Sequence, residues 1–193
     1  LSGDQMLIEA YKLLSNVPAA KLPTVLQLFN KMATEICEGQ QYDVDFESQE
    51  AVNIEEYLHM IRLKTSVLLG TALQIGAYIA GADQEAQRAI YDFGINVGLA
   101  FQIQDDILDV WGDPATFGKA VGGDIACNKK TFVFLTALQM ADIDHRRTLE
   151  NWYSRVLTDN TQKIAAVKSI FEAVGVRKAC EEKVNEYTET AMA

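Results

Sequence analysis

Three aspartates interrupt the hydrophobic run FQIQDDILD at residues 101–109. Aspartate is a poor helix-interior residue and is costly to bury without a partner. On a helix, Asp105 and Asp109 lie four residues apart on one face with Gln102, and Asp106 lies about 100° around the axis. A hard cation with oxygen ligands, above all Mg²⁺, would offset the repulsion between these carboxylates. The spacing is therefore compatible with a magnesium site, although by itself it fits a solvated acidic helix end as well. The alternative, a solvated acidic helix end, is disfavoured by the apolar neighbours VGLAF and IL.

A glycine-containing stretch with little periodicity, GDPATFGKAVGGDIACNKKT, follows at residues 112–131. It carries Lys119, Lys129 and Lys130, with Asp124 between them. Lysines and carboxylates around a long irregular loop suit the binding of a Mg²⁺–diphosphate, because lysines pair with phosphate oxygens and acids hold the metal. The net charge of −10 would repel an anion, but metals and lysines can invert a negative field locally. We therefore expect this loop to bind a diphosphate beside the aspartates.

Other chemistries have less support. The chain has two histidines, His59 and His145, and neither has neighbours that indicate nucleophilic catalysis. The nucleotide-binding patterns GxxxxGK[ST] and GxGxxG are absent from the sequence. Glu56 and His59 match the Glu-x-x-His of di-iron helical bundles, but those sites need a second copy of the motif and two further glutamates. We therefore favour the simpler interpretation, in which Glu56 lies at a helix start near a partly buried His59.

The elements that must position these residues are nearly all predicted to be helices. Apolar residues recur three and four apart, and capping-box spacing occurs at Ser2 with Gln5 and at Asn53 with Glu56. Asp83 is expected to cap the helix that carries the aspartates. The sequence shows no sustained strand-like alternation, repeat or linker. We predict one all-α domain over residues 1–193, with helices near residues 5–14, 24–47, 53–80, 83–111, 130–140, 145–157, 161–174 and 176–190.

Composition limits the classes of partner. A net charge of −10 disfavours binding to nucleic acid or to an acidic membrane. The most apolar run, SVLLGTALQIGAYIAGA, is shorter than a membrane span and is bracketed by Lys64 and Asp83. The three cysteines are far apart and lack CxxC spacing: Cys37, Cys127 and Cys180. Such cysteines are typical of reduced thiols in cytosolic proteins, so we expect a cytoplasmic location.

Several motifs together resemble one family. FQIQDDILD, followed by GK, GGD and NKKT, is similar to the second aspartate-rich motif and following loop of the trans-isoprenyl diphosphate synthases. LSGD, GQQYD at residues 39–43 and YLHMIRLKT also occur in the family's order, so the resemblance covers essentially the whole chain. It implies an isoprenoid-synthase-type helical bundle, a homodimer, and allylic diphosphate and isopentenyl diphosphate as substrates. The product would be a longer prenyl diphosphate of the geranyl, farnesyl or geranylgeranyl type.

One departure from the family pattern affects this interpretation. The family carries a first DDxx(xx)D motif, followed by an arginine pair, upstream of the SGD segment, and no such motif precedes SGD in these 193 residues. The chain also begins at Leu1, without Met or a signal peptide. We expect that an N-terminal portion precedes it, and that the chain alone is not a competent catalyst.

The resemblance assigns roles to the acids. Mg²⁺, with Mn²⁺ as a possible substitute, would bridge both aspartate-rich motifs and the substrate diphosphate. Asp105 would ligate the metal directly. Asp106 and Asp109 would act either directly or behind the metal ligands, and Asp124 through metal-bound water.

The resemblance also assigns residues to the substrates. Lys64, Lys119 and Lys129 would contact the allylic diphosphate, although sequence alone does not separate Lys129 from Lys130. Thr65 and Gln102 would lie near the carbocation, with Thr65 guiding the departing proton. Phe101 would line the isopentenyl or allyl pocket. Residues 39–43 fit a helix-packing feature and stay outside the predicted catalytic set.

The implied reaction is ionisation, condensation and elimination. Loss of diphosphate leaves an allylic carbocation, which the double bond of isopentenyl diphosphate attacks before a proton departs. This chemistry needs electrostatic stabilisation and a dry cavity, not a side-chain nucleophile. A noncatalytic or regulatory subunit is the first alternative, favoured by the absent first motif and disfavoured by Lys64 and Lys119. A terpene cyclase is the second, and the lysine-rich loop speaks against it.

Overall fold

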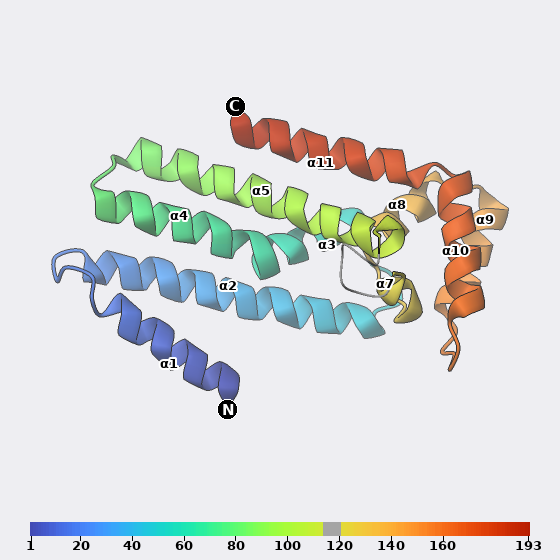
Figure 1. Cartoon of the computed structure of the whole chain (residues 1–193), viewed down its shortest axis with the longest axis horizontal. Helices are drawn as coiled ribbons and strands as arrows, with labels where there is room; N and C mark the ends of the chain where they lie inside the picture. Colours follow the sequence, from blue (N-terminus) through green and yellow to red (C-terminus); the bar gives the residue numbers. More distant parts are fainter. Residues whose placement is uncertain (114–120) are drawn as a thin grey trace.

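Long helices lying side by side make up most of the protein, which we describe for residues 1–113 and 121–193 of a computed structural model. They are α2 (Leu22–Ser48), α4 (Val67–Ala80), α5 (Gln84–Trp111) and α11 (Val176–Met192), with α1 (Ser2–Leu14) beside α2 (Figure 1). The helix α5 packs against both α4 and α11, and α2 packs against α4. No described residue lies in a strand, so the all-α prediction is confirmed.

Shorter helices gather at one end of this bundle (Figure 1). They are α7 (Gly123–Ala126), α8 (Phe132–Met140), α9 (Ile143–Tyr153) and α10 (Thr161–Ala173). Within the bundle, α3 (Ile54–Ile61) continues through a π-helical turn, η1 (Arg62–Ser66), into α4. The sequence predicted this stretch as one helix, and only the π-helical turn was not anticipated.

Side-chain caps mark four helix starts in the described part of the chain, those of α3, α5, α8 and α9. The predicted capping box is present at Asn53 and Glu56, where each side chain bonds the other residue's backbone N–H at 2.9 and 2.8 Å. Asp83 caps α5 as predicted, by accepting from the N–H of Ala86. The capping box predicted at Ser2 is wrong, because Ser2 already lies inside α1 and no side chain caps that helix.

Two other helix starts differ from the prediction for the same physical reason. Thr131 caps α8 by accepting from the N–H of Phe134, so α8 begins at Phe132. Asp142 caps α9 by accepting from the N–H of His145, so α9 begins at Ile143, ahead of the predicted residue. A capping side chain fixes a helix start more sharply than apolar periodicity does.

Small residues bring α4 and α5 into close contact. A Cβ on Gly94 would lie 2.6 Å from Gly70 Cα, and one on Gly98 would lie 2.6 Å from Ser66 Cα. The side of α5 that faces the bundle interior is apolar, with Ile103, Ile107 and Val110 nearly inaccessible to solvent. This packing fixes the rotation of α5 about its axis, and therefore where each aspartate points.

One stretch among the described residues, Ile54–Ala80, is long and apolar enough to cross a membrane by length and composition alone. It comprises α3, η1 and α4, and its helices pack on α2 and α5. That packing places the stretch within the helical bundle.

Candidate active site

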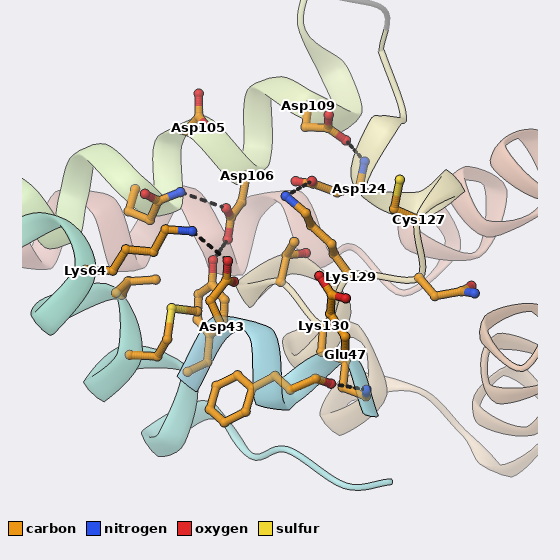
Figure 2. Close-up of a pocket in the computed structure, with 17 residues that line it drawn as sticks. Asp43, Glu47, Lys64, Asp105, Asp106, Asp109, Asp124, Cys127, Lys129 and Lys130 are labelled. Atoms are coloured by element: carbon orange, nitrogen blue, oxygen red, sulfur yellow. Dashed lines mark hydrogen bonds and ion pairs between the residues drawn. The ribbon is translucent and has the colours of Figure 1, made fainter. Parts of the chain in front are cut away.

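A cavity of about 680 Å³ opens where α2, η1, α5 and the segment after α7 meet (Figure 2). Nine of its lining residues are charged: the acids Asp43, Glu47, Asp105, Asp106, Asp109 and Asp124, and the cations Lys64, Lys129 and Lys130. Six acids against three lysines leave a local excess of negative charge. An anion would bind here only with additional cations, which is the chemistry of a metal–phosphate site.

Asp106 is the buried member of the three aspartates, with 3% of its surface exposed. Its Oδ2 accepts from the Tyr57 hydroxyl at 2.6 Å and from the N–H of Phe132 at 3.0 Å, and its Oδ1 accepts from Gln102 at 3.4 Å. Burial raises the pKa of Asp106 to about 7, against the opposing effect of these donors. Asp106 therefore joins α5 to α3 and to the first turn of α8.

Asp109 connects α5 to α7. Its Oδ2 accepts from the N–H of Asp124 at 3.1 Å, while its backbone carbonyl accepts from the N–H of Gly122 at 2.6 Å. Burial raises the pKa of Asp109, and the nearby Asp124 carboxylate raises it further. The acid thus places Asp124 and the start of α7 at the cavity wall.

Asp105 has a different environment. Its carboxylate forms no hydrogen bond or ion pair with any residue that the structure describes. Figure 2 shows it directed away from the Asp106 carboxylate, although it lines the same cavity. Of the three aspartates in the motif, it is the one whose oxygens have no partner in residues 1–113 and 121–193, so they are available to a ligand. Among the described residues, no three His, Cys, Asp or Glu side chains form a ready-made metal site.

Lys64 lies in the π-helical turn and pairs with Asp43 of α2, with 2.6 Å between Nζ and Oδ2. Gly39, one turn earlier on α2, makes this pairing possible. A Cβ there would lie 2.4 Å from the Lys64 backbone nitrogen, so only glycine lets α2 approach η1 so closely. In the same turn, the Thr65 hydroxyl donates to Gln102 Oε1 at 3.1 Å. Such π-turns are frequent at functional sites, because they alter the direction of side chains within a helix.

The two lysines that sequence could not separate have different partners. The ammonium group of Lys129 pairs with Asp124 at 3.1 Å. Burial acts to lower the pKa of Lys129, but the charge and hydrogen bond of Asp124, together with Asp43 and Cys127, raise it. Lys130 donates to the Phe46 carbonyl, 2.6 Å away in the last turn of α2. Lys130 therefore caps a helix C-terminus, whereas Lys129 remains among the cavity acids.

Not every predicted site residue lies in the cavity. Phe101 is 61% exposed and is absent from the lining of the cavity in the described part of the chain. Thr65 is absent from that lining too, although its hydroxyl bonds the lining residue Gln102. Lys119 lies outside the described residues. The other predicted residues line this one cavity: Lys64, Gln102, Lys129, Asp105, Asp106, Asp109 and Asp124.

The contacts of Glu56 and His59 do not support the hypothesis of a di-iron site. The Glu56 carboxylate is used in the capping box, and the His59 ring packs on Tyr42 with 5.7 Å between centroids. Sequence reasoning set aside Asp43, the partner of Lys64, with residues 39–43, and it missed Tyr57, the donor to Asp106. Asp43 could have been found from its spacing of four after Gly39, because that spacing puts both on one helix face.

The fold and the cavity together define an all-helical protein with a site of carboxylates and lysines suited to phosphate groups and metals. A family model described as polyprenyl synthetase matches residues 1–174. The chain therefore belongs to the polyprenyl synthetase family. The curated relatives that it resembles are trans-prenyl diphosphate synthases.

Individual relatives show the extent of the similarity. The chain is 40% identical over 150 residues to a short chain isoprenyl diphosphate synthase of Methanocaldococcus jannaschii, covering 77% of this chain and 46% of that protein. It is 34% identical over 196 residues to a geranylfarnesyl diphosphate synthase of Aeropyrum pernix, covering 99% and 60%. A crystal structure of a geranylgeranyl pyrophosphate synthase matches with a TM-score of 0.93 and 47% identity, covering 99% of this chain and 59% of that one. The chain spans about half the length of the curated relatives it matches.

Proposed function

We propose that this chain supplies the diphosphate-binding part of a prenyltransferase active site, which condenses an allylic diphosphate with isopentenyl diphosphate into a longer trans-prenyl diphosphate. The observation that carries the proposal is the Asp105 carboxylate, which no described residue bonds, in a cavity that also holds Lys64 and Lys129. The names of the relatives support the same activity.

The acids fit a hard divalent cation, Mg²⁺ or in its place Mn²⁺. Mg²⁺ binds through one or two carboxylates and completes its coordination with water and substrate phosphate oxygens, so a ready-made group of three ligands is not required. We propose Asp105 as the direct ligand, with Asp109 and Asp124 on the adjacent wall. Asp106 already accepts three hydrogen bonds, which favours a positioning role. When bound, the metal would neutralise charge that develops on the departing diphosphate.

The chain's own residues would serve the reaction by charge and by shape. Lys64 and Lys129 would hold the diphosphate as the allylic C–O bond breaks, since their ammonium groups lie at the cavity wall. The Thr65 and Gln102 oxygens would face the allylic cation while the isopentenyl double bond forms the new C–C bond. Thr65 would guide the proton that then leaves. Lys119 is proposed as a further diphosphate contact by family resemblance alone. Homodimerisation and a cytoplasmic location stay predictions.

The test is prenyl transfer by the full-length protein with Asp105→Ala. We expect turnover to fall by orders of magnitude while far-UV circular dichroism stays near native, because the Asp105 carboxylate has no hydrogen-bond partner to lose among the residues that the structure describes. Asp92→Ala, an exposed change on the same helix, is the matched control and should leave turnover unchanged. Turnover by Asp105→Ala equal to the control would overturn the metal assignment. A wild-type protein without prenyl transfer would instead favour the noncatalytic subunit.

A further inference from the structure

Lys163 on α10 is a fully buried lysine outside the cavity lining. None of its surface is exposed. Its ammonium group donates to Asn128 Oδ1 and to the Ala126 carbonyl, the latter at 3.3 Å. It also lies 5.5 Å from the centroid of the Tyr153 ring. All of these partners are neutral, and among the residues that the structure describes no carboxylate pairs with it.

Stability alone is a poor explanation for a lysine in this place. A buried ammonium group with neutral partners keeps only part of its solvation, whereas an apolar side chain of similar size would pack without that cost. Burial accordingly lowers the pKa of Lys163. What the lysine adds beyond packing is a donor directed at Asn128.

Asn128 has the backbone conformation that this donor would preserve. Among the described residues it is the one non-glycine residue with a positive φ, at 58°, a conformation that asparagine tolerates better than most side chains. Its carboxamide is held from two sides, since Oδ1 accepts from Lys163 and Nδ2 donates to the Arg155 carbonyl at 3.0 Å. The turn is therefore fixed to α10 and to the segment after α9.

The residues that follow this turn form one wall of the cavity. Lys129 comes next and pairs with Asp124 by its side chain, and its backbone N–H also bonds the Asp124 carbonyl at 2.9 Å. Three residues further on, the N–H of Phe132 holds Asp106. A change in the φ of Asn128 would redirect Lys129 first, because it is the next residue in the chain.

We propose that Lys163 is a positioning residue which, by holding Asn128 in its left-handed conformation, directs Lys129 toward a diphosphate in the cavity. The inference rests on the proposed function, because it takes the diphosphate as the ligand of Lys129. It assigns a role in ligand binding to a residue behind the cavity wall.

The experiment measures inorganic diphosphate binding in the presence of Mg²⁺ by calorimetry. Lys163→Met keeps the length of the side chain and removes its donors, and we expect about tenfold weaker binding. Lys168→Met, the same change on the same helix, is the control and should bind like the wild type. Asn128→Gly tests the other side of the contact, because glycine accepts a positive φ but offers no carboxamide. Asn128→Gly should weaken diphosphate binding as well. If Lys163→Met does not fold, the affinity of Asn128→Gly alone tests the inference.

A double-mutant cycle separates positioning from a general loss of stability. In a Lys129→Ala background, Lys163→Met should cost little further affinity, since the side chain that it positions is gone. An equal loss in both backgrounds, or wild-type affinity in both Lys163→Met and Asn128→Gly, would overturn the inference. If the wild-type chain itself binds no diphosphate with Mg²⁺, the proposed function fails at this site and the inference fails with it.

Discussion

Asp106 illustrates how a single side chain in this site responds to its surroundings. Three donors hold its oxygens, yet burial raises its pKa from the usual 3.8 to about 7. Burial and the nearby Asp106 carboxylate raise the pKa of Tyr57 well above its ordinary value. The phenol therefore keeps its proton and remains the donor. This hydrogen bond ties α3 to α5 below the cavity.

A pH dependence of stability follows from the raised pKa. Between about pH 4 and about pH 7, the folded protein retains a proton on Asp106 that the unfolded chain releases. The contribution of this group to the free energy of unfolding therefore falls as pH rises through that window and is constant above it. In urea unfolding across the window, the stability of the wild type should fall more steeply than that of Asp106→Asn, which retains the contribution of the raised pKa of Asp109. Asp92→Asn should retain the wild-type slope, and parallel profiles for wild type and Asp106→Asn would contradict the assignment.

Lys129 and Lys130 should separate in experiment as they do in space. Lys130→Ala removes the donor to the Phe46 carbonyl, so we expect a loss of about 1 kcal/mol in the free energy of unfolding. The affinity of the Lys130→Ala variant for diphosphate in the presence of Mg²⁺ should change little. Lys129→Ala should do the reverse, because Lys129 faces Asp124 in the cavity. Urea unfolding and calorimetry on both variants check this, and equal effects on affinity would refute the distinction.

At the scale of elements, the approach of α2 to η1 is what creates the Lys64–Asp43 pair. Gly39→Ala would place a methyl group 2.4 Å from a backbone nitrogen, which cannot rotate away as a side chain could. We expect a loss of about 1–3 kcal/mol in unfolding free energy together with weaker diphosphate binding. Gly76→Ala on α4 is the matched control, because nothing lies within 4 Å of its added methyl. That change should stabilise the protein slightly; a Gly39→Ala variant that behaves like it would rule out the close approach.

The same elements show which features a sequence can predict. The Asn53 and Asp83 caps act over three residues, so a short stretch of sequence is enough to predict them. Both helices start where these caps indicate. The π-helical turn and the Asp43 contact with Lys64 depend on two helices meeting, and the sequence gives no local signal for such a meeting. The burial of Asp106 likewise depends on Tyr57, 49 residues away. The motif therefore revealed which acids gather, but not which of them remains free.

For the molecule as a whole, charge determines how the cavity can be filled. The chain has a net charge of −10, and the charged residues lining the cavity are predominantly acidic. A diphosphate alone meets repulsion, and a divalent cation alone meets few fixed ligands. Each supplies what the other lacks, so their binding should be strongly cooperative.

This cooperativity can be measured as thermal stability. With Mg²⁺ and diphosphate both present at about a hundredfold above their dissociation constants, linkage gives about 2.7 kcal/mol, or a rise of about 5–10 °C in Tm. Either ligand alone should raise Tm far less. Asp105→Ala should abolish the excess over the separate effects, whereas Asp92→Ala should retain it. A combined rise no larger than the sum of the two separate rises would mean that metal and diphosphate do not share one site. Asp105 would then not be the ligand of a metal that is bound together with diphosphate.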